Sequence, residues 1–293
     1  MENDHATLKT CAACGSTASI FFLRKDGCDL YHCTHCGHGF MYPLPADTAG
    51  IYGEDYFAGA TQGAGYVEYD TDKEPMRPVF VDYLRRIETY TGKKGRLLDI
   101  GAATGFFVGI ATGCGWEAEG LEISRFAAEE ATQKGHKVTC GTLKDSQGDV
   151  GAFTVVTMWD VLEHITDPDT EIRAVYNLLE VGGVVAINTP DMGSWYARVM
   201  GKRWHLLVPP EHVHYFTTTG IKIFLERNGF RVELTSKIGK TFTLEYVVHI
   251  LATWLKSSVL RRLASYLKGH PRIGGLSMPI NLRDNMFVIA RKI

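Results

Sequence analysis

LLDIGAATGF, at residues 97–106, is the stretch of this chain that decides its fold. Its first part is apolar apart from Asp99 and predicts a buried strand, and Gly101 and Gly105 bracket a tight turn into a helix. A second apolar run ends at Glu122, 21 positions after Gly101. Such a turn brings backbone N–H groups close to a ligand, and an acidic residue about 20 positions later can bind a ribose diol. The stretch therefore predicts the nucleoside-binding edge of an α/β sheet.

Strand and helix patterns alternate along most of the chain. Strands are expected at residues 96–100, 117–122, 136–140, 152–158, 183–189, 230–237 and 285–291. Helices are expected between them, near residues 105–113, 124–134, 168–180 and 218–228. This alternation predicts a Rossmann-like, doubly wound, seven-stranded and mostly parallel sheet, with its ligand at the carboxyl ends of the strands.

Length, composition and charge limit the classes of protein to consider. The chain has 293 residues, of which 45% are hydrophobic and 22% charged, as is ordinary for a soluble globular protein. The net charge of −2 does not predict a nucleic-acid-binding surface. The polar N-terminus lacks the layout of a signal peptide, and no apolar run approaches the length of a membrane span. We therefore expect a cytoplasmic protein without a transmembrane segment.

Four of the seven cysteines form two Cys-x-x-Cys pairs, Cys11 with Cys14 and Cys33 with Cys36. The pairs are separated by 18 residues, and each is followed by glycine. This spacing predicts a zinc ribbon at residues 8–42, in which four thiolates bind one tetrahedral ion. The alternative, two disulfides or unrelated thiols, is disfavoured because the chain lacks an export signal. Four thiolates leave no open coordination position, so we expect the zinc to be structural.

The rest of the chain divides into a connector at residues 43–75 and a main domain at residues 76–293. Two inserts interrupt the main domain. The first, at residues 190–216, carries tryptophans, prolines and histidines. The second, at residues 242–268, has the pattern of one or two basic amphipathic helices. We expect the second insert to cover the substrate cleft; contact with a membrane surface is the less favoured alternative.

The turn itself restricts the choice of cofactor. A dinucleotide-binding loop needs a middle glycine where this chain has Ala103, and the Gly-Lys-Ser/Thr of a triphosphate-binding loop is absent. S-adenosylmethionine carries an adenosine without phosphates and fits better. Asp99 would then organise the loop and receive the amino group of the cofactor, directly or through water. Glu122 would accept hydrogen bonds from both ribose hydroxyls.

Several segments of the chain, in the right order, resemble those of class I S-adenosylmethionine-dependent methyltransferases. LLDIGAATGF resembles the first motif of this family. Three later segments of the chain resemble its later motifs: GLEIS at residues 120–124, VVTMWDVLEHITDP at 155–168 and LEVGGV at 179–184. PEHVHYFT, at residues 210–217, resembles a segment of the branch with an N-terminal zinc ribbon. That branch is often associated with sugars, polysaccharides and secondary metabolites.

The resemblance implies an S-adenosylmethionine-dependent methyltransferase acting on oxygen or carbon of a small molecule: a sugar, a polysaccharide precursor or a secondary metabolite. Many relatives place an acidic residue against the adenine, but residues 141–143 read GTL, so packing on Leu143 is expected instead. The implied cofactor-binding residues are Asp99, Gly101, Ala102, Ala103, Gly105, Glu122, Ile123, Leu143, Trp159 and Asp160.

Candidate catalytic residues lie in two places. Methyl transfer depends on positioning, and a general base helps when the acceptor is a hydroxyl or an acidic carbon. Glu163 and His164 follow the fourth strand, although helix capping and support of the cofactor loop would also explain them. His212 and His214 lie in the first insert. We expect one of these two to face inward, with His212 preferred as the acceptor contact; a histidine that only fixes the loop is the alternative.

Two other functions remain open at this point. An RNA methyltransferase could use the ribbon to bind RNA, but the chain lacks both the Asn/Asp-Pro-Pro-Tyr segment of base-amino methylation and a Pro-Cys nucleophile. A non-catalytic zinc scaffold could retain a degenerate cofactor fold. The sequence names neither the acceptor nor the oligomeric state.

Overall fold

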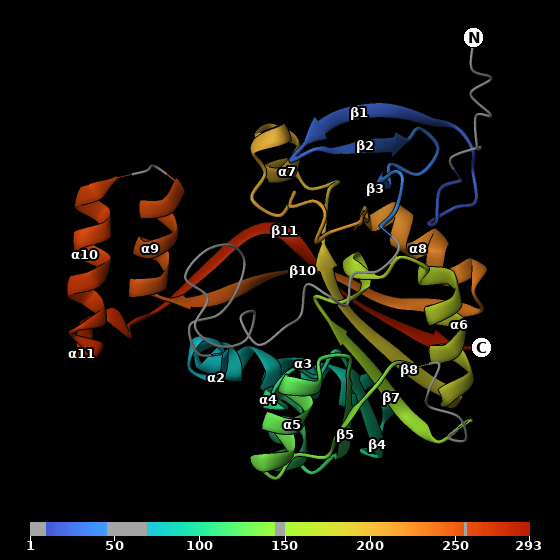
Figure 1. Cartoon of the computed structure of the whole chain (residues 1–293). Helices are drawn as coiled ribbons and strands as arrows, with labels where there is room; N and C mark the ends of the chain where they lie inside the picture. The colour runs from blue at the N-terminus through green and yellow to red at the C-terminus, as the bar shows by residue number, and fades with distance from the viewer. Residues whose placement is uncertain (1–9, 46–68, 144–149, 255–256) are drawn as a thin grey trace.

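The computed structural model describes residues 10–45, 69–143, 150–254 and 257–293. A seven-stranded sheet forms the centre of the main domain, in the order β10-β11-β8-β7-β4-β5-β6 (Figure 1). Its parallel strands are β4 (Arg96–Ile100), β5 (Glu117–Glu122), β6 (Val138–Cys140), β7 (Phe153–Trp159) and β8 (Leu179–Pro190). β11 (Ser277–Lys292) runs antiparallel to β8 and to β10 (Phe230–Thr243). The predicted Rossmann-like, mostly parallel sheet of seven strands is confirmed.

The inner strand β4, which lies between β7 and β5, is buried on both faces. Leu97 packs in one apolar cluster, while Leu98 and Ile100 pack in another, because successive side chains of a strand point to opposite faces. Each buried leucine or isoleucine contributes about 1.5–3 kcal/mol. The first cluster includes residues of α3 (Arg77–Thr91) and α4 (Phe106–Gly113), and the second those of α6 (Pro168–Leu178) and α8 (Thr218–Arg227). Helices therefore cover both faces of the sheet, as in a doubly wound fold.

Several shorter elements complete the main domain. α2 (Tyr69–Lys73) and the 3₁₀ turn η2 (Glu74–Met76) precede α3, and α5 (Arg125–Gln133) lies between β5 and β6 in the chain. The 3₁₀ turn η3 (Leu162–His164) follows β7, and the first insert contains α7 (Trp195–Met200) and η4 (Gly201–Arg203). Residues 46–68, which make up most of the predicted connector, lie outside the described residues.

The N-terminal cysteine segment forms a second, four-stranded sheet in the order β1-β2-β3-β9. Its strands are β1 (Ser19–Lys25), β2 (Cys28–Cys33), β3 (Gly39–Met41) and β9 (His214–Tyr215). β9 comes from the first insert of the main domain and pairs with β3. A Cβ on Gly39 would lie only 2.5 Å from the Met192 sulfur, so glycine permits this close packing. The ribbon thus joins the main domain through a shared sheet.

The last two strands extend beyond the central sheet as a hairpin. β11 pairs with β8 only from Asn285 onward, while its first half pairs with β10 alone. The predicted strands at 230–237 and 285–291 are shorter than β10 and β11 and correspond to the part of the hairpin inside the central sheet. The register shift between Ile238 and Lys240 interrupts the alternating pattern beyond this part. The hairpin carries α9 (Leu244–Trp254), α10 (Ser258–Lys268) and α11 (Pro271–Gly274) (Figure 1). Within the described residues, no helix has the length and apolar character needed to cross a membrane.

Candidate active site

The turn between β4 and α4 lies on the end of β5. The backbone N–H groups of Gly101 and Ala102 donate to the Leu121 carbonyl at 2.8 and 3.1 Å. A Cβ on Gly120 would lie 2.5 Å from the Ala102 Cβ, so the close approach of the two segments requires a glycine in β5. Ala103 has a φ of 49°, in the left-handed region that an alanine rarely adopts. The fold therefore maintains a locally unfavourable backbone conformation at the centre of the predicted cofactor loop.

Glu122 is the side chain that holds this conformation. Its Oε2 accepts a hydrogen bond from the Ala103 N–H and its Oε1 one from the Ser124 N–H, each at 2.8 Å. Burial raises the pKa of the carboxyl, while these backbone donors oppose that shift. A carboxylate offers about four lone-pair positions, so each oxygen retains capacity for a further donor. The geometry suits a carboxylate that both fixes the loop and accepts the two hydroxyls of a ribose.

Asp99 lies at the end of β4 and is almost completely buried. The Thr157 hydroxyl donates to Asp99 Oδ1 at 2.6 Å. Burial raises the pKa of Asp99 to about 8, against the opposing effect of the Thr157 hydrogen bond. A carboxyl of this kind becomes charged readily when a cation is placed beside it, because the cation compensates the cost of burying the charge.

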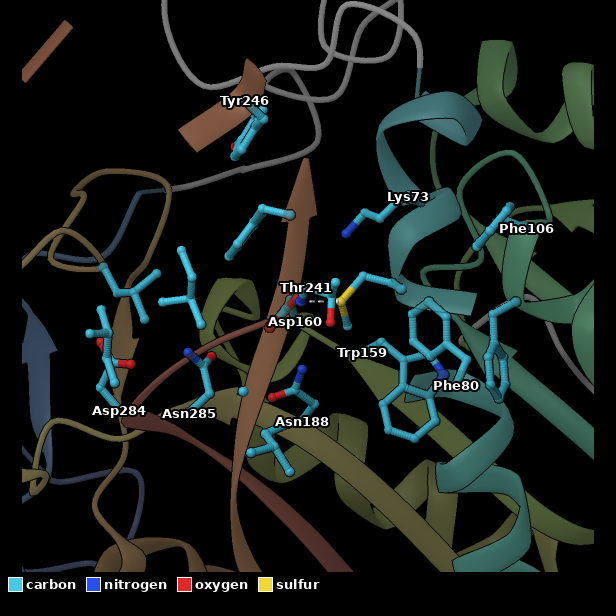
Figure 2. A pocket seen from close by; sticks show the side chains of 18 of the residues that line it. Lys73, Phe80, Phe106, Trp159, Asp160, Asn188, Thr241, Tyr246, Asp284 and Asn285 are labelled. Atoms are coloured by element: carbon cyan, nitrogen blue, oxygen red, sulfur yellow. Dashed lines mark hydrogen bonds between the residues drawn. The ribbon is translucent and has the colours of Figure 1, made fainter. Parts of the chain in front are cut away.

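A cavity of about 420 Å³ extends from the turn to the hairpin (Figure 2). At the turn its wall includes Asp99, Gly101 and Ala102, followed by Trp159 and Asp160 at the end of β7. The apolar part of the wall comprises Met76, Phe80, Phe106, Phe107, Leu206, Ile238, Phe242, Val247, Leu251, Ile280 and Leu282. α9, in the second insert, supplies part of this wall through Tyr246, Val247 and Leu251.

Polar groups of this cavity that sequence reasoning missed gather opposite the turn. His205 and Asp284 both line the cavity, with His205 Nδ1 3.7 Å from Asp284 Oδ2. Asp284 is only 3% exposed, and Trp204 Nε1 donates to its Oδ2 at 2.8 Å. A histidine next to a buried carboxylate can act as a general base, because the carboxylate stabilises the imidazolium that forms. His205 lies in the first insert and Asp284 in the last strand, and no sequence spacing connects them.

The structure places the ten predicted cofactor residues in two groups. Five of them, Asp99, Gly101, Ala102, Trp159 and Asp160, line the cavity. The other five lie in the turn, at the end of β5 or after β6, and they are absent from the described cavity wall: Ala103, Gly105, Glu122, Ile123 and Leu143. Ile123 is 44% exposed, whereas Leu143 is packed in the core.

Three of the four predicted catalytic residues lie together, but outside the described cavity wall. Ligand atoms of Glu163, His164 and His212 are within 4.8 Å of one another. The two imidazole rings meet edge to face with centroids 4.7 Å apart. The Glu163 carboxylate is buried and accepts a hydrogen bond from the Thr189 hydroxyl at 2.9 Å. Their prediction as catalytic residues therefore receives no support from the cavity.

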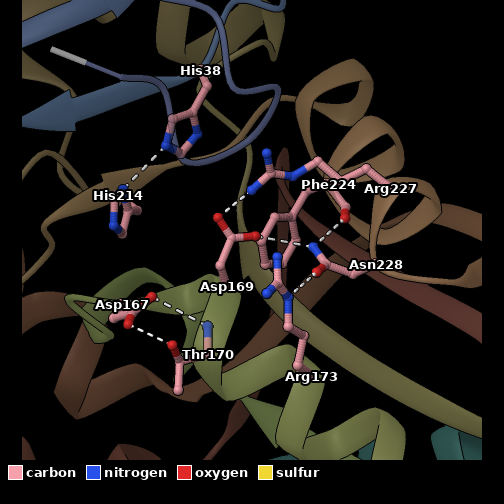
Figure 3. A network of polar contacts seen from close by, with 9 residues as sticks. All are labelled: His38, Asp167, Asp169, Thr170, Arg173, His214, Phe224, Arg227 and Asn228. Atoms are coloured by element: carbon pink, nitrogen blue, oxygen red, sulfur yellow. Dashed lines mark hydrogen bonds and ion pairs between the residues drawn. The ribbon is translucent and has the colours of Figure 1, made fainter. Parts of the chain in front are cut away.

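His214 lies at the junction with the ribbon instead. Its Nδ1 is 3.1 Å from Nε2 of His38 (Figure 3), and burial lowers its pKa to about 4. The expectation that only one of His212 and His214 faces inward is wrong, since both are buried. Side chains two residues apart on an extended segment point to the same side, so His212 and His214 are buried together. Figure 3 also shows Asp169 of α6 paired with Arg227 of α8 beneath this junction.

The four ribbon cysteines have the geometry of a metal site. Cys11 Sγ lies 3.6 Å from Cys36 Sγ, and Cys14 Sγ lies 3.6 Å from Cys33 Sγ. All four sulfurs are within 4.8 Å of one another. Thiolates bound to one tetrahedral zinc are about 3.8 Å apart, whereas a disulfide needs about 2.05 Å. The donor set fits zinc and does not fit disulfides.

Comparisons with known proteins agree with the fold. The family described as a methyltransferase domain matches residues 73–235, more than half of the chain. The ubiquinone biosynthesis O-methyltransferases of Pectobacterium carotovorum and Vibrio campbellii are 28% and 30% identical over 149 and 152 residues. Each match covers 47% of this chain and about three-fifths (62% and 63%) of the relative.

Among solved structures, a SAM-dependent methyltransferase from Archaeoglobus fulgidus is similar, with 20% identity and a TM-score of 0.50. That alignment covers 74% of this chain and 94% of the other, and it supports the fold alone. The fold, together with this family match, is that of a class I methyltransferase. The chain belongs to the methyltransferase-domain family.

Proposed function

We propose that this enzyme transfers the methyl group of S-adenosylmethionine to an oxygen of a small molecule with a largely apolar body. The observation that carries the proposal is the cavity, which connects the cofactor turn to His205 and Asp284 along an apolar wall. Sugars need many polar partners, so a secondary metabolite suits this wall better than a sugar or a polysaccharide precursor. The names of the curated relatives, which are O-methyltransferases, support oxygen as the acceptor atom.

The cofactor is proposed to lie across the carboxyl ends of β4, β5 and β7. Glu122 accepts the ribose hydroxyls, and Ile123 and Leu143 pack on the adenine. Asp99 receives the amino group, and Trp159 and Asp160 border the methionine end. The turn at residues 101–105 approaches the cofactor through its backbone, since Gly101 and Gly105 carry no side chain. This arrangement directs the sulfonium methyl into the cavity.

In the proposed reaction the acceptor oxygen attacks the methyl carbon opposite the sulfur. The carbon–oxygen bond forms as the carbon–sulfur bond breaks, and S-adenosylhomocysteine leaves with the electron pair. The hydroxyl proton passes to Nε2 of His205, and Asp284 stabilises the imidazolium that results. The Trp204 N–H fixes the Asp284 carboxylate. His205 therefore replaces His212 as the general base that we propose.

The cysteine cluster is proposed to hold a structural zinc ion. Four thiolates fill its coordination sphere, so the ion would stabilise the ribbon and take no part in methyl transfer. The ribbon in turn packs on β9 and the following segment, where the Thr217 hydroxyl donates to the Cys36 carbonyl at 2.9 Å. Its proposed role is to support the first insert, which carries His205.

The test is a search for product with trideuteromethyl-labelled S-adenosylmethionine. The enzyme is incubated with a metabolite extract, and small molecules, RNA and protein are then analysed separately by mass spectrometry. The proposal expects the label on oxygen of a small molecule. Label in RNA would support the RNA methyltransferase instead, and cofactor binding without a labelled product in any fraction would contradict the proposed activity.

A further inference from the structure

We propose that Glu163, His164 and His212 form a second metal site, which binds a divalent transition-metal ion. The three side chains come from η3 and from the first insert, and their ligand atoms lie within 4.8 Å of one another. The cluster is separate from the four ribbon cysteines. It also differs from them chemically, since two imidazole nitrogens and one carboxylate oxygen replace four thiolates.

The histidines are oriented as metal ligands usually are. His164 Nδ1 is 2.8 Å from the Glu211 carbonyl oxygen, and His212 Nδ1 is 2.8 Å from the Leu206 carbonyl oxygen. Each Nδ1–H donates to its carbonyl, because a carbonyl oxygen can only accept. The neutral ring therefore has its lone pair on Nε2, and Nε2 is the nitrogen that would coordinate an ion. Metal-binding histidines are typically fixed by such a hydrogen bond from the other ring nitrogen to a backbone carbonyl.

The carboxylate is supported in the same way. The Thr189 hydroxyl donates to Glu163 Oε2, and Glu163 is only 1% exposed. Burial of a carboxylate is costly unless a positive charge or strong donors compensate it, and a divalent ion supplies that charge. The Val213 N–H donates to the Glu163 carbonyl at 2.9 Å, so the backbone itself holds the two ligand segments together.

The donor set identifies the class of ion. Two histidines and one carboxylate with open positions suit iron(II), zinc and similar ions, whereas magnesium prefers an all-oxygen shell. Ligands bound to one such ion at about 2.1 Å lie about 3–3.5 Å apart, so binding requires a closure of an ångström or so. His164 is only partly buried, which gives an ion a route of access. Three protein ligands leave at least one position open.

The neighbours of the cluster connect it to the cavity. Leu206, whose carbonyl orients His212, lines the cavity, and so does Asn188, next to Thr189. An ion in this cluster would therefore influence the position of the cavity wall. The proposal does not depend on the acceptor or on the proposed reaction, because metal content is measured on the resting enzyme.

The experiment compares bound metal in the full-length, untagged protein and in three variants. After growth with zinc, elemental analysis of the wild type should find about two ions per chain. Glu163→Gln preserves size and the hydrogen bond from Thr189, and His212→Ala removes one nitrogen ligand; each should retain about one ion, held by the cysteines. His249→Ala replaces an exposed histidine of α9 and should retain two.

A titration keeps the test independent of variant folding. Wild-type protein treated with a mild chelator should retain the thiolate-bound zinc and then take up one equivalent of cobalt(II), without thiolate-to-metal charge-transfer absorption. A thousandfold excess of magnesium should not displace this cobalt. Saturation of the wild type at one ion per chain, or two ions retained in Glu163→Gln and His212→Ala, would overturn the proposal and leave the cluster as a hydrogen-bonded clamp. Displacement by magnesium would overturn the class of ion.

Discussion

Replacing Glu122 by glutamine should weaken cofactor binding by about 1.5–3 kcal/mol, or ~10- to 150-fold in Kd. The carboxylate accepts from the Ala103 and Ser124 N–H groups at 2.8 Å and has lone pairs left for both ribose hydroxyls. Glutamine has a single acceptor oxygen, and its NH₂ group would face one of these backbone donors. The variant therefore loses at least one charge-assisted hydrogen bond to the ribose and weakens the support of the left-handed Ala103.

The assay is calorimetric titration with S-adenosylhomocysteine, which binds the same site without reacting. Glu117→Gln is the matched control, because Glu117 begins the same strand and its side chain is 74% exposed. The control should bind as the wild type does, and thermal melting should show that all three proteins are folded. An affinity of Glu122→Gln within twofold of the wild type would refute the placement of the ribose at this carboxylate.

Three further predictions concern the proton, the base and the ribbon. The cofactor's ammonium group should lower the pKa of Asp99 from about 8, so binding at pH 7 should release on the order of one proton, and none well above pH 8. The buffer takes up the released proton, so the binding enthalpy of the wild type, measured by calorimetry, should differ between phosphate and Tris, whose heats of protonation differ. The same difference between buffers in Asp99→Asn would contradict this. His205→Ala should lower kcat about 10²- to 10⁴-fold with unchanged affinity for S-adenosylhomocysteine, and wild-type turnover would exclude it as the base. Cys33→Ser should lose the ribbon zinc and melt at a lower temperature. Its zinc content is measured by elemental analysis in a variant that also carries Glu163→Gln, so that the second proposed site does not contribute. One zinc ion per chain in this double variant would contradict the ribbon site.

The sheet and its cofactor edge could be predicted from sequence because the signals there are local. The strand, turn and helix at residues 96–113 follow one another directly, and Glu122 ends the next strand along the chain. Parallel strands place such successive ends at one edge, so a one-dimensional pattern determines their proximity. The cysteine pairs are predictable for the same reason, since each Cys-x-x-Cys turn brings its two thiolates together.

The proposed acceptor side could not be predicted, because its residues meet only through tertiary packing. His205 follows the short turn η4, and Asp284 lies in a strand whose outer half pairs only with β10. The sequence predicts that His212 and His214 lie in a loop near the acceptor, but His212 contacts His164 and His214 contacts the ribbon residue His38. A side chain's chemistry is visible in the sequence, whereas the partner that decides its role depends on the arrangement of distant segments.

The measurement that tests the account most directly is a crystal structure of the full chain with S-adenosylhomocysteine. The account predicts the ribose hydroxyls on Glu122, the amino group beside Asp99 and the sulfur facing the cavity walled by His205 and Asp284. A sulfur directed instead at Glu163, His164 and His212, with the cavity closed off from it, would contradict the proposed acceptor site and the base within it.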